Sequence, residues 1–441
     1  MLYAEALQYL LSLGHETLAM KLGLANTERL LEALGQPQKA FRKVQIAGTN
    51  GKGSSAVMLY EIVRAAGINA ALYTSPHLVN ITERMRFNGQ EIQPQYFAEL
   101  TAKVRKVSTE LRDAGVIPAL PTFFEHLTVM FLLACSEMKM ELVILETGLG
   151  GRLDATTAAG AEIVAISPVA LDHQEYLGNT LADIAAEKAA IIRTGVESVV
   201  VAPQQPEALA VIKQRAALCE VSMRLNDCRV EVRGAEQDGR LRATFKTSED
   251  VYENVLLGLR GRHQATNACV ATGLAEALRQ SGFAIKRADI ISGLERARHA
   301  GRLEIREGQP RILFDGAHNV AGARALRDYL DEFVQTPLTL VFGAMRDKEL
   351  AEIAAILFPA ARRLILAEPA SPRAATLEML VDALPHDYAS QTEVTLAKSL
   401  REALSHAREQ TPRDELICVT GSLYLVGEAQ SLLLSPARES D

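Results

Sequence analysis

The sequence predicts an α/β protein built on doubly wound parallel sheets, and three observations support this fold class. Short continuous apolar runs, typical of central parallel strands, alternate with helical patterns along most of the 441 residues. A charged, alternating stretch at about 221–260 predicts a small antiparallel sheet. After 298–302 the alternation of strands and helices restarts, which predicts a smaller second α/β domain. We therefore expect domains over 1–298 and 299–441.

The individual elements follow from apolar periodicity and from the residues that end each run. Gly67 closes one helix, Thr180 is a plausible N-cap, and Gly301 is expected to open the first strand of the second domain. The expected strands lie at 41–48, 69–75, 141–146, 161–169, 198–202, 311–316, 338–344, 363–369 and 415–422. The expected helices lie at 1–16, 54–67, 127–138, 180–193, 264–282, 286–298, 321–334 and 347–357, with one before residue 415 and one at the C-terminus.

Composition excludes several classes of protein. Apolar residues make up 48% and charged residues 23%, as in ordinary globular proteins. The net charge of -7 argues against non-specific nucleic-acid binding. The five cysteines are scattered and odd in number, so we expect a reducing compartment and neither a disulfide framework nor a zinc site. No run of eighteen uncharged apolar residues predicts a membrane span, and the expected location is the cytoplasm.

The segment GTNGKGS, residues 48–54, lies between an expected strand and an expected helix. Glycines let backbone N–H groups approach a phosphate, the helix N-terminus adds partial positive charge, and Lys52 supplies a full charge. The spacing departs from the standard phosphate-binding loop, because Gly53 follows the lysine where serine or threonine is usual and Ile46 replaces the distal glycine. Phosphate binding is favoured over an ordinary tight turn, because a lysine between two glycines has little structural use.

Further polar residues follow the ends of other expected strands, where ligands of open α/β sheets bind. Ser75 and Glu146 suit Mg²⁺, although Ser75 taken alone favours a solvated loop and Glu146 alone could form a salt bridge. His173 is a weak signal by itself. Lys188 follows on an apolar helix, either as the partner of a surface carboxylate or as a lysine neutral enough to react with CO₂.

Nearby charged residues have similar alternatives. Arg84 and Arg86 could bind anions, and Asp154 could instead pair with Arg152. In the second half, polar residues in HQATN, GRLE, FDGAHN and GAMRDKE add to those of the first half. Each is weak alone, but together they describe a cleft between two domains.

The complete set of motifs resembles the folylpolyglutamate synthase and dihydrofolate synthase family of the Mur ligase superfamily. GTNGKGS, TSPHL, ETGLGGRLDAT, LDH, GRLE, DGAHN, VFGAMRDK and VTGSLYL occur in the family order from residue 46 to 428. The resemblance implies an N-terminal P-loop ATPase-type domain and a C-terminal, Rossmann-like glutamate-ligase domain. It also implies ATP, two Mg²⁺ ions, carbamylated Lys188, L-glutamate, and dihydropteroate or a reduced folate as substrate, in a monomer.

The resemblance also implies roles for individual residues. Lys52, Lys188 and His318 would be catalytic, and Ser75, Glu146 and His173 would bind Mg²⁺. ATP would be bound by Gly48, Thr49, Asn50, Gly51, Lys52, Gly53, Ser54, Asn267, Arg302 and Asp315. The pterin pocket of bifunctional members would be formed by Thr122, Phe123, Phe124, Leu153 and Asp154.

Departures from the family pattern affect the shape of the pocket more than the reaction. Tyr176 stands where tryptophan is frequent, Ala190 where glycine is usual, and Ala300 and Val320 where proline is common. A muramyl-type ligase is the main rival interpretation, but about 40 residues before the first motif are too few for its extra N-terminal domain. A nucleotide-binding regulator without catalysis is the other, and the candidate metal ligands argue against it.

Overall fold

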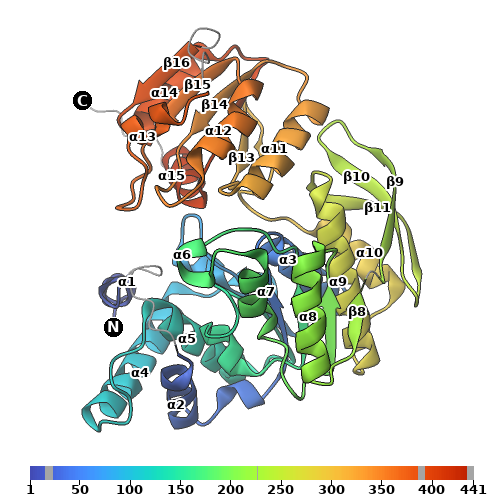
Figure 1. The fold of residues 1–441 in the computed structure, drawn as a ribbon. Helices are drawn as coiled ribbons and strands as arrows, with labels where there is room; N and C mark the ends of the chain where they lie inside the picture. The colour runs from blue at the N-terminus through green and yellow to red at the C-terminus, as the bar shows by residue number, and fades with distance from the viewer. Residues whose placement is uncertain (15–22, 226, 386–392, 435–441) are drawn as a thin grey trace.

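A computed structural model describes residues 1–14, 23–225, 227–385 and 393–434, and Figure 1 shows its ribbon. The expected N-terminal helix is present as α1 (Tyr3–Ser12). The last two residues of that prediction, 15–16, lie outside the described ranges.

The large sheet of the first half has the strand order β4-β3-β2-β5-β1-β6-β7-β8. β1 lies between β5 and β6 and is parallel to both, while β3 and β4 add an antiparallel edge beside β2. The strands are β1 (Arg42–Ala47), β2 (Ala70–Tyr73), β3 (Met85–Phe87), β4 (Gln90–Glu91), β5 (Leu142–Glu146), β6 (Ile163–Ile166), β7 (Ser198–Val201) and β8 (Met223–Leu225). This order confirms the doubly wound sheet. β3 was not expected, because the sequence around it reads as a loop and only pairing with β2 makes it a strand.

Both faces of this sheet are buried, which explains its continuous apolar strands. In β5, Leu142 and Ile144 face one core cluster while Val143 and Leu145 face another. One face packs on α3 (Lys52–Ala65), α9 (His263–Gln280) and α10 (Arg287–Arg296). The other packs on α1, α2 (Ala25–Ala33), α4 (Pro94–Asp113), α5 (Phe123–Glu137), α7 (Leu181–Ala189) and α8 (Pro206–Leu218).

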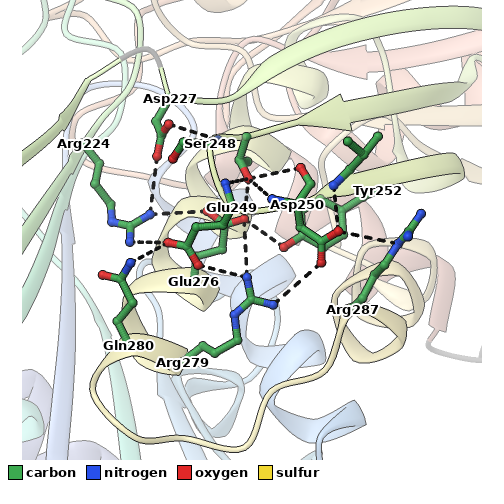
Figure 2. Close-up of polar contacts among 12 residues, drawn as sticks. Arg224, Asp227, Ser248, Glu249, Asp250, Tyr252, Glu276, Arg279, Gln280 and Arg287 are labelled. Atoms are coloured by element: carbon green, nitrogen blue, oxygen red, sulfur yellow. Dashed lines mark hydrogen bonds and ion pairs between the residues drawn. The ribbon is translucent and has the colours of Figure 1, made fainter.

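A small antiparallel sheet of order β11-β10-β9 lies beside α9 and α10, as expected from the charged stretch. Its strands are β9 (Arg229–Ala235), β10 (Arg240–Lys246) and β11 (Val251–Arg260). The expectation was wrong for β8, which joins the large sheet parallel to β7. Ion pairs anchor the turn between β10 and β11, as Figure 2 shows: Glu249 contacts Arg224 of β8 at 2.5 Å and Arg279 of α9 at 3.0 Å.

The second half forms a separate sheet of order β12-β13-β17-β14-β15-β16, parallel except for β12. Its strands are β12 (Glu304–Arg306), β13 (Arg311–Asp315), β14 (Leu338–Phe342), β15 (Arg363–Ala367), β16 (Glu393–Ala397) and β17 (Leu416–Thr420). Its helices are α11 (Val320–Phe333), α12 (Leu350–Leu357), α13 (Leu377–Asp382), α14 (Leu400–Gln410) and α15 (Leu423–Leu434).

Three details of this second sheet differ from expectation. Its first strand begins at Glu304, not at Gly301, whose φ of +67° belongs to a turn. The helix expected from 347 begins at Leu350. The pair β16 and α14 was read as part of a single helical stretch, because β16 is an edge strand with few buried side chains. No helix of the described ranges is long and apolar enough to cross a membrane.

Candidate functional site

The loop 48–54 joins β1 to α3 at the carboxyl end of the large sheet, and its backbone is held tightly. The Thr49 N–H donates to the carbonyl of Pro168 at 3.0 Å, and the Thr49 hydroxyl donates to the carbonyl of Ala170 at 2.9 Å. Gly51 has a φ of +85°, and a β-carbon there would lie 2.1 Å from Oδ1 of Asn267. Only glycine fits this turn, so the loop keeps the backbone conformation that a phosphate cradle requires.

Lys52 is the first residue of α3 and lines a cavity with an interior volume of about 520 Å³. Its Nζ donates to the carbonyls of Gly48 and Thr49, both at 3.1 Å. Burial lowers the pKa of Lys52, although the charge of Glu146 works in the opposite direction. A partly buried ammonium at the start of a helix is suited to meeting a multiply charged phosphate chain.

Gly53 explains why this loop departs from the standard spacing. A β-carbon at Gly53 would lie 2.7 Å from Cε1 of His299 and 3.1 Å from a carboxylate oxygen of Glu146. Serine or threonine at this position would have to displace the side chains of His299 and Glu146. The hydroxyl is supplied one position later by Ser54, whose Oγ lies 3.3 Å from Nδ1 of His299.

Glu146 ends β5, and Ser75 follows the neighbouring strand β2. The two strand ends bring them together, since the Ser75 N–H donates to Oε2 of Glu146 at 3.1 Å. Burial raises the pKa of Glu146, while Lys52 opposes that shift. The contact excludes the fully solvated alternative for Ser75, and both residues line the cavity.

His173 also lines the cavity, at the start of α6 (Gln174–Leu177), with a left-handed φ of 51°. Burial lowers the pKa of His173 to about 4, so its imidazole is neutral at physiological pH and able to ligate a metal. Within the described ranges, three or more His, Cys, Asp or Glu side chains do not converge as a preformed metal cage. A single carboxylate with a hydroxyl and an imidazole is the kind of sparse set that leaves ligand positions for phosphate oxygens and water.

Lys188 is 4% exposed in the last turn of α7, and its Nζ donates to the carbonyl of Gly48 at 2.8 Å. The surface-pair alternative is therefore wrong. Burial, with the nearby charge of Lys52, lowers the pKa of Lys188 to about 7. The alternative pair of Asp154 and Arg152 is also wrong, because the Arg152 guanidinium binds Glu187 at 2.9 Å.

A second part of the cavity is lined by Thr122, Phe124, Leu153 and Asp154. Thr122 is the N-cap of α5, and the carboxylate of Asp154 accepts the Leu149 N–H at 2.9 Å. Phe123 does not line the cavity. It is buried in the core with the guanidinium carbon of Arg84 5.5 Å from its ring centre.

Two expectations for this region need correction. Phe123 and Phe124 are consecutive helical residues and so point in different directions. The sequence motif alone does not show which of the two faces the cavity. Arg84 was a candidate anion ligand, but it is 1% exposed and its Nε donates to Nδ1 of His77 at 2.8 Å.

The second half of the chain completes the cavity with Arg302, Asp315 and His318, and Asn267 of α9 also lines it. The carboxylate of Asp315 accepts the N–H groups of Leu303 and Ala317, each at 2.9 Å. Burial raises the pKa of Asp315 and the charge of Arg302 opposes it. These residues were all proposed from short motifs, and the structure brings them to one cavity.

Sequence reasoning missed the contacts that join the two halves. Asp172, directly before His173, accepts a hydrogen bond from Lys348 Nζ at 2.6 Å and another from Asn319 Nδ2 at 3.1 Å. Asn319 also donates to Oδ1 of Asn50 in the phosphate loop at 3.2 Å. Burial disfavours ionisation of Asp172, but His318 and the charges of His173 and Lys348 outweigh it and hold the pKa well below its usual range. The motifs DGAHN and GAMRDKE contain Asn319 and Lys348 and each follow a strand end, and these were the sequence features that could have indicated the contacts.

Fold and site together define a ligase of the Mur type. The model of the Mur ligase middle domain matches residues 46–275, and that of the Mur ligase glutamate ligase domain matches residues 301–423. The dihydrofolate synthase/folylpolyglutamate synthase of Bacillus subtilis is 32% identical over 424 residues, which covers 95% of this chain and 97% of the relative. The chain belongs to the dihydrofolate synthase/folylpolyglutamate synthase family.

Two further relatives extend this comparison. A probable bifunctional folylpolyglutamate synthase/dihydropteroate synthase of Halobacterium salinarum is 33% identical over 446 residues, and the chain spans 53% of that relative's length. The crystal structure of Mycobacterium tuberculosis folylpolyglutamate synthase complexed with ADP and AMPPCP has a TM-score of 0.88 at 28% identity, covering 98% of this chain and 99% of that chain.

Proposed function

We propose that this protein is an ATP-dependent ligase that joins L-glutamate to dihydropteroate and to the γ-carboxylate of reduced folates. The observation that carries the proposal is the grouping of a phosphate-type loop, a buried carboxylate and a buried lysine in one cavity lined by both halves of the chain. Similar solved structures are described as complexes with DHPP and ADP, and with Mn, AMPPNP and L-glutamate.

ATP binding is assigned to both halves of the chain. The loop Gly48–Ser54 cradles the phosphates, with Lys52 as the positive charge. Asn267, Arg302 and Asp315 line the cavity beyond the loop and hold the nucleoside part. His318 donates from Nδ1 to the carbonyl of Gly316 at 2.8 Å, which fixes its ring at the edge of the cavity. We assign the incoming glutamate to this part of the cavity.

Mg²⁺ is assigned to Ser75, Glu146 and His173, and the residues fit it. Glu146 offers a buried carboxyl group, Ser75 offers a hydroxyl beside it, and His173 offers a neutral ring. The ions, two in this proposal, neutralise charge on the phosphate oxygens when bound. Carbamylation of Lys188 would add a second carboxylate near them, and its desolvated amine supports this reaction with CO₂.

The pterin ring is assigned to the part of the cavity formed by Thr122, Phe124, Leu153 and Asp154. Phe124 offers an aromatic face, and Asp154 and Thr122 offer polar edges for a heterocycle. Phe123 supports this wall from the core. The pairing of an aromatic face with a carboxylate favours acceptance of dihydropteroate as well as folates.

The reaction needs activation of a carboxylate. The γ-phosphoryl group of ATP passes to the substrate carboxylate, giving an acyl phosphate and ADP, and the glutamate amine then attacks the acyl carbon and releases phosphate. Lys52 neutralises charge on the transferring group, and the loop aligns it with the carboxylate. The contacts of Asp172 with Lys348 and Asn319 close the cavity and exclude water from the acyl phosphate.

We also propose a division of the chain at residues 298 and 299, and function as a cytoplasmic monomer. Both halves of one chain line the cavity, so one copy supplies every assigned residue. The five cysteines are free thiols, which suits a reducing compartment.

Lys52→Ala tests the proposal. ADP release that requires both dihydropteroate and glutamate should fall by about 100- to 1,000-fold or more, the cost of losing one strong donor to a transition state. The matched control is Lys103→Ala, an exposed lysine of α4 that should leave the rate unchanged. Full activity of Lys52→Ala would overturn the phosphate role, and wild-type protein that binds ATP without any ADP release would favour a regulator.

A further inference from the structure

Two thiols meet outside the cavity. Sγ of Cys228 lies 2.6 Å from Sγ of Cys269, and Cys269 Sγ also lies 3.6 Å from the carbonyl oxygen of Cys228. The two residues are separated by 41 positions in sequence, Cys228 just before β9 and Cys269 in the second turn of α9. Both are free and half-buried, whereas Cys135, Cys219 and Cys418 are buried.

The ion network of Figure 2 holds the two backbone segments in this position. Asp227, directly before Cys228, pairs with Arg224 at 3.4 Å and accepts the Ser248 N–H at 3.3 Å. Arg224 also reaches Glu276, which lies on the same helix as Cys269, at 3.3 Å. Charged side chains therefore fix the approach of β9 to α9, and the proximity of the thiols does not depend on their own weak hydrogen bond.

Both residues pack against the apolar core but keep part of their surface exposed, so the pair lies close to the molecular surface. The hydrogen bond to Cys269 and burial raise the pKa of the Cys228 thiol, so the features that favour exchange here are geometric: the two thiols are close, anchored and partly exposed. Cys135, Cys219 and Cys418 are more deeply buried and serve as internal controls.

We propose that Cys228 and Cys269 form a thiol–disulfide exchange site that takes a small disulfide of the oxidised-glutathione class and closes to an intramolecular disulfide. The thiolate of one cysteine attacks a sulfur of oxidised glutathione, forming a mixed disulfide and releasing one glutathione thiol. The second cysteine loses its proton to solvent and attacks the mixed disulfide, releasing the second glutathione. Two protein thiols are oxidised while one glutathione disulfide is reduced.

The closed form would join the start of β9 to α9, whose first turns also place Asn267 beside the phosphate loop. The link is local and does not use any residue of the cavity. Formation of the disulfide can therefore be measured without reference to ligase activity, and its outcome is independent of the proposed function.

The test uses the full chain, incubated with oxidised or with reduced glutathione and then denatured. Thiols that react with a chromogenic disulfide should fall from five to three after oxidation, and dithiothreitol should restore five. The intact mass should drop by two hydrogen atoms. Trypsin should yield the peptide 225–229 linked to the peptide 263–279.

Serine variants give the controls. Cys228→Ser and Cys269→Ser should each stop at a mixed disulfide and gain the mass of one glutathione, while Cys219→Ser should still lose two thiols. Circular dichroism melting in reducing buffer checks that each variant folds. Five remaining thiols after oxidation of the wild type, a stable mixed disulfide in the wild type, or a linkage between other cysteines would each overturn the proposal.

Discussion

The carbamylation proposed for the buried amine of Lys188 should be sensitive to pH and to dissolved CO₂. Its pKa of about 7 means that about half of the molecules carry a neutral, reactive amine at pH 7. An ordinary lysine would be neutral in only about one molecule in 2,500 at that pH. Burial therefore raises the reactive fraction by about a thousandfold, enough to decide whether a carbamate forms.

The sign of the pH dependence follows from the direction of the shift. A lowered pKa leaves the neutral amine present above about 7 and removes it as pH falls through that value. Between pH 6 and pH 8 the neutral fraction should rise from about one tenth to about nine tenths. The carbamate, and with it the ligase rate, should increase over this window.

In the assay, the protein is preincubated at different pH values with the concentration of dissolved CO₂ held constant. The initial rate of ADP release is then measured at one common pH. Wild-type protein kept free of CO₂ should lose activity and recover it with bicarbonate. Lys188→Ala should be inactive and partly restored by acetate or formate, while Lys103→Ala should behave as wild type. A rate in wild type that is independent of CO₂, or an active Lys188→Ala without added acid, would refute the carbamate.

Three further substitutions probe the loop, the pterin wall and the contact between the halves. Gly51→Ala should lower the free energy of unfolding by about 1–3 kcal/mol and weaken ADP binding in calorimetry, because its β-carbon meets Asn267 at a positive φ; unchanged binding would contradict the loop geometry. Phe124→Ala should raise KM for dihydropteroate by about two- to tenfold, a loss of about 0.5–1.5 kcal/mol, with KM for ATP unchanged; a selective rise in KM for ATP would place the pterin ring elsewhere. Asp172→Asn removes the carboxylate that pairs with the buried ammonium of Lys348, and should disfavour contact between the two halves of the chain by up to about 3–5 kcal/mol. The radius of gyration measured by X-ray scattering with ATP bound should then increase. An unchanged radius would show that Asp172 does not hold the two halves together.

The fold was predictable wherever the apolar pattern of a segment matches the burial of that segment in the folded protein. The continuous apolar run of β5 is buried on both faces, and Thr180 caps α7 as its sequence indicates. The strands β3 and β16 were not predictable: β3 has only three residues, β16 is an edge strand with few buried side chains, and the partners of both lie elsewhere in the chain.

The candidate site was predictable where a residue follows a strand end, since parallel strands bring such residues to one edge of a sheet. Ser75 and Glu146 illustrate this rule. The direction of adjacent side chains on a helix was not predictable, which is why Phe123 was placed wrongly. The role of Asp172 was hidden for another reason: its partners Lys348 and Asn319 belong to the other half of the chain.

The central claim is that ATP activates a carboxylate as an acyl phosphate, and isotope transfer tests it directly. Dihydropteroate labelled with oxygen-18 in both carboxylate oxygens is incubated with the protein, ATP and L-glutamate, and the released phosphate is analysed by mass spectrometry. The mechanism predicts one labelled oxygen in the phosphate for each glutamate joined. Ligated product accompanied by unlabelled phosphate would contradict it.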